Sequence, residues 1–251
     1  MKRFICKSAL TLGCKVAGVK AYIEDDIFTT HAHDFVEEPE FLGAYARGIK
    51  AAGPHYYFRW RVHVALWAAG VARRLPGDFV ECGTNKGFVA SAIMHTLDWN
   101  SCGKRFFLLD TWQGLDVATL SDEEKKAGFV ENSQKWIKEG IYETDFEAVT
   151  KNFSEWKNVS LIKGTIPATL PQITSDQIAF LHLDLNCSPP EIAALEYLWP
   201  KLVPGAMVLH DDYGGFPLSK LGMDEIAGRL GVQFVTLPTG QGLMIKPPEA
   251  R

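Results

Sequence analysis

Three aspartates stand at the ends of apolar segments, where they could hold a metal ion. Asp184 closes the run 177–185, and Asp211 and Asp212 follow the apolar run 206–209. Carboxylates that lie close together repel one another unless they are protonated or share a cation. A ligand set made only of oxygen atoms suits a hard divalent ion, with Mg²⁺ first and Ca²⁺ or Mn²⁺ also able to fit. A role as turn and helix-cap residues explains Asp212 better than Asp184.

A second group of residues surrounds a short loop with two glycines. In residues 81–88 (ECGTNKGF), Gly83 and Gly87 allow close approach to the backbone, and the helix that follows offers free N–H groups. The same spacing also suits a simple tight turn, and it is neither G-x-G-x-x-G nor a phosphate-binding P-loop. Asp110 closes the next apolar run, a position from which an acid accepts hydrogen bonds from ribose hydroxyls.

The charges near this loop distinguish between nucleotide cofactors. Glu81 and Asp110 are carboxylates, which repel a pyrophosphate and attract a sulfonium and an amino group. The pattern therefore favours S-adenosylmethionine over NAD, with a nucleotide-dependent redox enzyme as the alternative on these residues alone. The predicted cofactor-binding residues are Glu81, Gly83, Thr84, Asn85, Gly87, Phe88, Asp110 and Thr111.

Alternating strands and helices must position these residues. Apolar runs and helical spacing predict strands at 78–82, 105–110, 159–162, 177–185, 206–209, 233–237 and 242–245, and helices at 40–52, 58–75, 88–97, 191–202 and 219–230. Unbroken apolar strands that alternate with helices are typical of a largely parallel sheet covered on both faces. The last two strands have no helix between them, so one of them should run antiparallel. The sequence therefore predicts an α/β, doubly wound, Rossmann-like sheet.

The chain divides near residue 76. Residues 1–76 are expected to form an N-terminal helical region that serves as a lid or contacts the acceptor or another subunit, and residues 77–251 the cofactor-binding domain. Residues 1–20 are basic and fairly apolar, which favours an amphipathic helix packed on protein over a membrane anchor or a signal peptide. The polar segment 112–158 is predicted to be an insertion or a lid with short helical patches.

The motifs together resemble the macrocin O-methyltransferase family, over about residues 54–246. The resemblance rests on DFVECG at 78–83, DTWQGL at 110–115, VSLIKGTIPATLP at 159–171 and DDYG at 211–214. The family usually has DTFEGL where this chain has DTWQGL, so Gln113 lacks the family's charge. The resemblance implies a class I methyltransferase fold of about seven strands with the last strand reversed. It also implies methyl transfer from S-adenosylmethionine to macrolide or aminocoumarin sugars.

The resemblance assigns metal binding to Asp184, Asp211 and Asp212, and it marks one departure. The family often has a second aspartate, proposed as general base, two residues after the first, and Asn186 stands at that catalytic position here. An amide is not a base. Either the metal alone ionises the acceptor hydroxyl, or another residue takes the proton.

Several histidines and tyrosines are available for that role. His182 and His210 are expected to be structural, because each lies within or beside a buried strand. The N-terminal region could fold over the site, and its candidates are His31, His33, His55, Tyr56 and Tyr57. The sequence does not choose among them.

The composition excludes several classes of protein. The 251 residues are 47% hydrophobic and 22% charged, as in ordinary globular proteins, and the net charge of −4 argues against general nucleic-acid binding. The five cysteines form no C-x-x-C pair, which favours a reducing, cytoplasmic setting over a disulfide scaffold or a structural zinc site. No run reaches the roughly 18 apolar residues of a membrane-spanning helix. The apolar N-terminal segment and the aromatic stretch 56–67 could support a homo-oligomer.

Three functions remain compatible with these observations. The first is Mg²⁺-dependent O-methylation of a hydroxyl on a sugar or sugar-bearing small molecule. The second is methyl transfer to another class of acceptor, such as a catechol-like diol. The third is a nucleotide-binding protein that is not an enzyme, which loss of the metal aspartates would favour. All three aspartates are present, which argues against the third function. The N-terminal region and residues 112–158 should form the acceptor pocket that distinguishes the first two, and their aromatic residues permit either; the resemblance favours the first.

Overall fold

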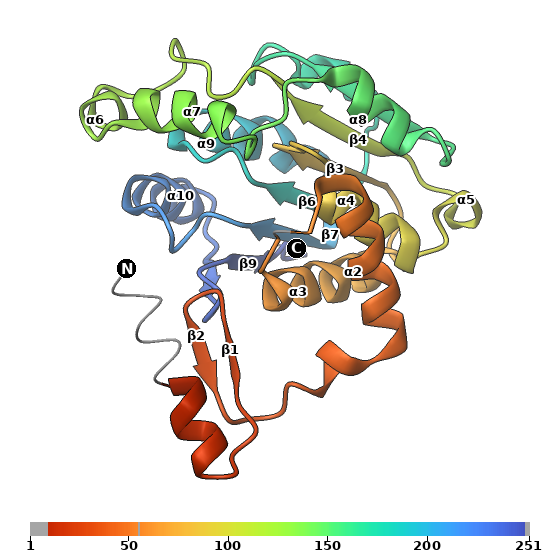
Figure 1. Cartoon of the computed structure of the whole chain (residues 1–251). Helices are drawn as coiled ribbons and strands as arrows, with labels where there is room; N and C mark the ends of the chain where they lie inside the picture. Colours follow the sequence, from red (N-terminus) through yellow and green to blue (C-terminus); the bar gives the residue numbers. More distant parts are fainter. Residues whose placement is uncertain (1–9, 55, 249–251) are drawn as a thin grey trace.

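A seven-stranded sheet forms the centre of the molecule (Figure 1). In the computed structural model, which describes residues 10–54 and 56–248, the strand order is β5-β4-β3-β6-β7-β9-β8. The strands are β3 (Asp78–Cys82), β4 (Phe106–Asp110), β5 (Val159–Lys163), β6 (Ile178–Leu183), β7 (Leu202–His210), β8 (Val235–Thr236) and β9 (Gly242–Ile245). Strands β3 to β7 are parallel, and β9 runs antiparallel to β7 and β8. The predicted doubly wound sheet with a reversed last strand is confirmed.

The central strands are apolar throughout because both faces of the sheet are covered. All six residues of β6 are buried, as are four of the five in β4. The rings of Phe106 and Phe180 lie 5.7 and 5.2 Å from that of Phe79, measured between centroids. These contacts join β4, β3 and β6, so the aromatic core holds together the strands whose ends carry the candidate site.

Helices cover this sheet. They are α2 (Pro39–Ala52), α3 (Arg59–Ala72), α4 (Phe88–Thr96), α5 (Trp99–Cys102), α8 (Phe146–Phe153), α9 (Ser188–Leu198) and α10 (Pro217–Arg229), with short 3₁₀ turns η1 (Asp34–Glu37), η2 (Leu170–Gln172) and η3 (Trp199–Lys201). Helix α4 packs against both α2 and α3, and α3 contacts β6 and β7 (Figure 1). Helices α9 and α10 pack against each other. Within the described ranges, no helix is both long and apolar enough to cross a membrane.

The segment between β4 and β5 holds more helix than the sequence predicted. Helix α6 (Asp122–Lys126) begins at a capping box, and α7 (Phe129–Lys138) follows it after a glycine in the left-handed conformation. Helix α8 buries Val149 and Phe153 in the main core and therefore helps to cover the sheet. In Figure 1, α6 and α7 lie toward the side to which the arrows of β6 and β7 point.

The N-terminal region contains a hairpin that the sequence analysis missed. Strands β1 (Tyr22–Glu24) and β2 (Ile27–Thr29) pair antiparallel, and both turn residues between them have positive φ. Residues 10–16 are helical, with Leu12 64% and Val16 82% exposed. The remainder of the predicted N-terminal helix, residues 1–9, lies outside the described residues.

Two helical glycines give a matched test of the helix packing. A Cβ on Gly48 in α2 would lie 2.4 Å from the ring of Phe88, which stacks on Tyr56 with ring centroids 3.9 Å apart. A Cβ on Gly70 in α3 would meet nothing within 4 Å. Gly48→Ala should therefore lower the free energy of unfolding by about 1–3 kcal/mol through overpacking. Gly70→Ala should raise it by about 0.5–1 kcal/mol, because alanine favours the helix. Urea denaturation measures both changes, and effects of equal sign would contradict this packing.

Candidate active site

The three predicted aspartates lie together at the carboxyl edge of the sheet, where β6 and β7 end side by side. One carboxylate oxygen from each of Asp184, Asp211 and Asp212 lies within 4.8 Å of the others, and we call these residues the acid cluster. The backbone extends the sheet to reach them. The N–H of Asp184 donates to the carbonyl of Cys82, and that of Asp211 donates to the carbonyl of Leu183, both at 2.8 Å.

Burial and mutual proximity shift the pKa values of the three acids in different directions. Removal from water and the neighbouring acids raise the pKa of Asp184 well above its ordinary value and that of Asp212 to about 7. Burial also opposes ionisation of Asp211, but the guanidinium of Arg61, together with His182 and Gln241, outweighs it and holds the pKa of that carboxyl well below its usual range. Three oxygen-bearing side chains that repel one another in this way fit a hard divalent cation.

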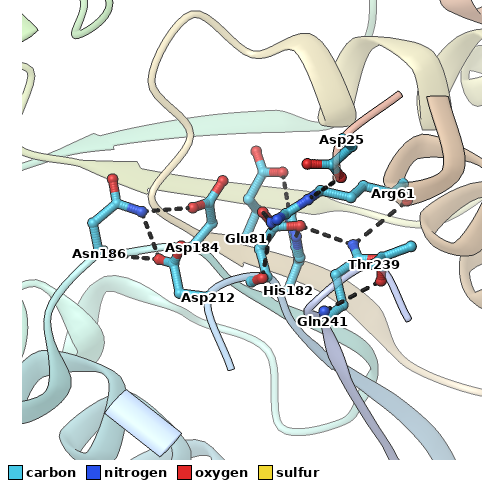
Figure 2. Close-up of polar contacts among 10 residues, drawn as sticks. Asp25, Arg61, Glu81, His182, Asp184, Asn186, Asp212, Thr239 and Gln241 are labelled. Carbon is cyan, nitrogen blue, oxygen red and sulfur yellow. Dashed lines mark hydrogen bonds and ion pairs between the residues drawn. The ribbon is translucent and has the colours of Figure 1, made fainter. Parts of the chain in front are cut away.

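Two residues that the sequence analysis did not single out hold Asp211. Arg61 Nη1 donates to Oδ2 of Asp211 at 2.7 Å, and Gln241 Nε2 donates to Oδ1 at 2.8 Å. Arg61 Nε also donates to Asp25 Oδ2 at 2.7 Å, in the turn of the β1–β2 hairpin (Figure 2). One guanidinium therefore connects the N-terminal hairpin to the acid cluster.

Asn186 lies between the other two acids (Figure 2). Its Nδ2 donates to Asp184 Oδ1 at 3.1 Å and to Asp212 Oδ2 at 2.5 Å, and its backbone N–H donates to Asp212 Oδ2 at 2.9 Å. Its Oδ1 accepts a hydrogen bond from the hydroxyl of Tyr142 at 2.6 Å. The residue has a φ of 56°, a left-handed conformation in which asparagine is enriched. The amide thus acts as a donor toward the acids.

His182 lies between Glu81 and the acid cluster. Its Nδ1 is 2.9 Å from Glu81 Oε1, and its Nε2 is 3.9 Å from Asp211 Oδ1. Burial lowers the pKa of His182, but the facing carboxylates of Asp211 and Glu81 outweigh burial and raise the pKa to about 10. His182 therefore serves as a counter-charge between the two carboxylates, in line with the structural role expected for it. His210 is buried against Glu191, with Nε2 and Oε2 3.0 Å apart.

The N-terminal candidates for a general base lie in different surroundings. Tyr56 packs beside the site, where burial and nearby acids raise the pKa of its hydroxyl. Tyr57 is 52% exposed, and His33 Nδ1 hydrogen-bonds the carbonyl of His31. His55 lies outside the described residues. Tyr56 is therefore the one whose position beside the site the structure describes.

The predicted glycine loop lies directly on the acid cluster. Gly83 has a φ of +95°, and a Cβ there would lie 1.8 Å from the carbonyl oxygen of Asp184, so only glycine allows this approach. Asp110 accepts hydrogen bonds from the N–H of Asn85 at 2.7 Å and of Trp112 at 2.8 Å. It therefore joins the loops that follow β3 and β4.

Two concavities open around this loop. The first, of about 850 Å³, is lined by residues that include Gly83, Asn85, Asp110, Thr111, Tyr142, Asp184 and Asn186. The second, of about 1130 Å³, is lined by residues that include Glu81, Gly83, Thr84, Asn85, Phe88 and Asp184, and by Ala52, Tyr56 and Phe58 of the N-terminal region. Most of the predicted cofactor-binding residues thus line one concavity or both. Gly87 belongs to the same loop but is not among the lining residues of either concavity. A Cβ on Gly87 would lie 2.5 Å from the ring of Phe153.

Residues 139–143, which we call the lid segment, border both concavities. Ile141 lines the two of them. Asn85 Nδ2 donates to the carbonyl of Ile141 at 3.0 Å, and Lys86 Nζ donates to that of Gly140 at 2.6 Å. The predicted insertion therefore reaches the glycine loop, which no local sequence pattern indicated for these residues.

Curated relatives are identical to the chain at about a quarter of the aligned positions. The 8-demethyl-8-(2,3-dimethoxy-α-L-rhamnosyl)-tetracenomycin-C 4'-O-methyltransferase of Streptomyces olivaceus is 25% identical over 171 residues, 64% of this chain and 62% of that protein. The mycinamicin III 3''-O-methyltransferase of Micromonospora griseorubida is 24% identical over 63% of each chain. The demethyldecarbamoylnovobiocin O-methyltransferase of Streptomyces niveus is 26% identical over 64% of this chain and 62% of that protein. The chain therefore spans less than two thirds of the length of these relatives.

Solved structures share the fold. The O-methyltransferase NovP superposes with a TM-score of 0.67 at 19% identity, over 80% of this chain and 88% of its own. The calicheamicin methyltransferase CalS11 gives a TM-score of 0.53 at 17% identity, over 83% of this chain and 93% of its own. These likenesses identify a methyltransferase fold.

A family profile gives the assignment. The profile described as Macrocin-O-methyltransferase (TylF) matches residues 63–228, from α3 to α10. This range contains the glycine loop, the lid segment and the acid cluster. The chain therefore belongs to the macrocin O-methyltransferase family.

Proposed function

We propose that the protein is an S-adenosylmethionine-dependent and divalent-metal-dependent O-methyltransferase that acts on a hydroxyl of a sugar or sugar-bearing small molecule. The observation that carries the proposal is the position of Asp184, which lines both concavities and belongs to the acid cluster. A cofactor, a cation and an acceptor can therefore meet at one point. Membership of the family supports the reaction class.

The cofactor fits along the glycine loop. Asp110 and Thr111 line the first concavity, where a carboxylate suits ribose hydroxyls. In the second concavity, Glu81 Oε2 and Thr84 Oγ1 are buried, and beyond the interaction between these two side chains neither atom has a hydrogen-bond partner among the residues that the structure describes. Buried polar atoms usually have partners. Their free capacity suits the amino-acid half of S-adenosylmethionine, with its positive charge beside Glu81.

The acid cluster would hold the cation. When bound, a divalent cation orients two adjacent hydroxyls of an acceptor and lowers the pKa of one of them. The protein keeps the acids in place, because Arg61 and Gln241 fix Asp211. The hydroxyl oxygen must then lie in line with the sulfonium methyl. Orientation and charge stabilisation supply most of the acceleration of such a transfer.

The acceptor would enter through the second concavity. The rings of Tyr56 and Phe58 lie 4.9 Å apart between centroids and belong to the N-terminal region. Aromatic rings beside polar groups suit a sugar, which offers both C–H faces and hydroxyls. We therefore assign acceptor binding to residues 1–76 and cofactor binding to residues 77–251. The relative from Streptomyces olivaceus is named for a rhamnosyl compound, which supports a sugar-bearing acceptor.

Asp110→Asn should weaken binding of S-adenosylmethionine by about 10-fold to 150-fold, since a charge-assisted hydrogen bond contributes about 1.5–3 kcal/mol. The amide keeps the size of the carboxylate but can accept only one of the two backbone hydrogen bonds, from Asn85 and Trp112, that Asp110 accepts, so circular dichroism must show that the variant is folded. Calorimetric titration measures the affinity. Asp145→Asn, at the N-cap of α8, is the control and should bind the cofactor normally. Unchanged affinity of the Asp110 variant, or tight binding of NAD instead, would contradict the assigned cofactor site.

Asp211→Asn and Asp212→Asn should abolish methyl transfer and cation binding while S-adenosylmethionine affinity stays near the wild-type value. Both residues belong to the acid cluster, whereas Asp184 also borders the concavities and its variant can affect both ligands. Titrations with Mn²⁺ and with the cofactor separate the two effects. Full methyl-transfer activity in the presence of EDTA would rule out the metal requirement.

A panel of acceptors tests the substrate class. Methyl transfer from labelled S-adenosylmethionine should be detected with sugar-bearing compounds that offer adjacent hydroxyls, because the cation would bind both oxygens. Glycosides whose sugar hydroxyls are blocked are the matched controls and should remain unlabelled. If only catechols were labelled, the acceptor would be a catechol-like diol and the proposal of a sugar-bearing acceptor would be wrong.

A further inference from the structure

The side-chain amide of Asn186 occupies the space between two acids. Its Nδ2 lies 3.1 Å from Asp184 Oδ1 and 2.5 Å from Asp212 Oδ2, and Tyr142 donates its hydroxyl hydrogen to Oδ1 at 2.6 Å. Figure 2 shows the amide directed at both carboxylates. N–H donors between two carboxylates offset part of their repulsion, which is also what a shared cation does.

When Asp184 and Asp212 are both ionised, only one orientation of the amide suits them. If the amide turned by half a rotation, its carbonyl oxygen would face two carboxylate oxygens, and three acceptors would repel one another. The hydroxyl of Tyr142 reinforces the observed orientation, because it donates to the carbonyl oxygen of Asn186. The hydrogen bond of the tyrosine therefore favours the donor orientation of the asparagine.

A divalent cation bound to the acid cluster would favour the opposite orientation of the Asn186 amide. The N–H groups of Asn186 would repel an ion held by Asp184 and Asp212, whereas its carbonyl oxygen would attract the ion. Amide carbonyls are ordinary ligands of hard divalent cations. Because Asn186 already lies within hydrogen-bond distance of both acids, its amide is within reach of an ion that they share.

We propose that Asn186 is a fourth protein ligand of the cation, and that Tyr142 couples cation binding to the position of the lid segment. This inference rests on the proposed function, since it requires a cation at the acid cluster. When the carbonyl of Asn186 turns to the ion, the hydroxyl of Tyr142 can no longer donate to it and can only accept a hydrogen bond from Nδ2. A phenol is a better donor than acceptor, and Tyr142 belongs to the lid segment, so the same rotation weakens one contact that holds the lid against the site.

The lid segment has further contacts that do not involve the acid cluster. Lys86 Nζ donates to the carbonyl of Gly140, and Asn85 Nδ2 donates to that of Ile141. Weakening of the Tyr142 contact therefore loosens the lid without detaching it. Coupling between two events is reciprocal, so a change that removes the Tyr142 hydrogen bond must in turn favour the cation.

Calorimetric titration of Mg²⁺ into the full chain without cofactor tests the coupling. Tyr142→Phe should bind the ion about threefold to tenfold more tightly, because one hydrogen bond no longer favours the donor orientation of Asn186. Lys86→Met removes a different lid contact and should leave the affinity unchanged. This control separates lid mobility from the contact with Asn186.

Asn186→Ala distinguishes a ligand from a spacer between the acids. If the amide is a ligand, this variant should bind Mg²⁺ more weakly than the wild type. Tighter binding would mean that the amide only competes with the ion, and it would overturn the ligand assignment. Circular dichroism verifies that each variant is folded, and Tyr142→Phe provides the second test should Asn186→Ala not fold.

Hydrogen–deuterium exchange follows the lid without any turnover. Addition of Mg²⁺ to the wild type should speed exchange of the amides in residues 139–143, and the same addition to Tyr142→Phe should not. Equal Mg²⁺ affinities for the wild type, Tyr142→Phe and Lys86→Met would overturn the coupling and leave the proposed function intact. A wild-type protein that binds no divalent cation would overturn both.

Discussion

Repulsion among the three carboxylates of the acid cluster is the constraint on which the rest of the site depends. Their oxygens come within 4.8 Å of one another at the end of two buried strands, where water screens charge poorly. Each acid therefore has a partner from elsewhere. Arg61 and Gln241 bind one acid, and the amide of Asn186 bridges the other two. The site is built as much from these partners as from the acids.

The partners connect the acid cluster to segments that the sheet alone would not hold. Arg61 is shared with Asp25 in the hairpin turn, and the neighbouring hairpin residue Glu24 pairs with Arg59, which lies two residues before Arg61 in α3. A hairpin of two three-residue strands is not stable by itself. Two adjacent ion pairs attach it to α3. The N-terminal region thus contributes both a wall of the second concavity and part of the electrostatics of the acid cluster.

Much of the sheet could be predicted because each strand is a local signal. The predicted limits of β3 and β9 agree with the structure to the residue, since apolar runs there end at turns. The hairpin and α7 escaped prediction for physical reasons. Three residues are too few to show alternation, and of the ten residues of α7 only Ser133 is buried, so the helix has no marked apolar run. Whether a lid closes over the site cannot be inferred from polarity alone.

The site residues, too, fall into those that a local sequence pattern predicts and those that it does not. Strand ends marked the acids and the glycine loop, because the carboxyl ends of parallel strands share one edge. Arg61, Gln241 and Tyr142 could not be found in this way. Arg61 and Asp211 are 150 positions apart in the chain, and Gln241 reaches the same acid from a loop between the last two strands. Such roles depend on tertiary contacts and leave no local pattern.

Charge explains why an amide suits position 186. A carboxylate there would add a fourth negative charge to the acid cluster. The guanidinium of Arg61, which pairs with Asp211, could not balance this charge, because it also pairs with Asp25. An amide can donate hydrogen bonds to the acids in one orientation and offer an oxygen to a cation in the other. An ionised carboxylate could offer an oxygen to the cation but could not donate a hydrogen bond to the acids. Neither orientation of the amide offers an atom that can take a proton from the acceptor. Among the candidate bases of the N-terminal region that the structure describes, Tyr56 is the one that lines the second concavity beside Asp184.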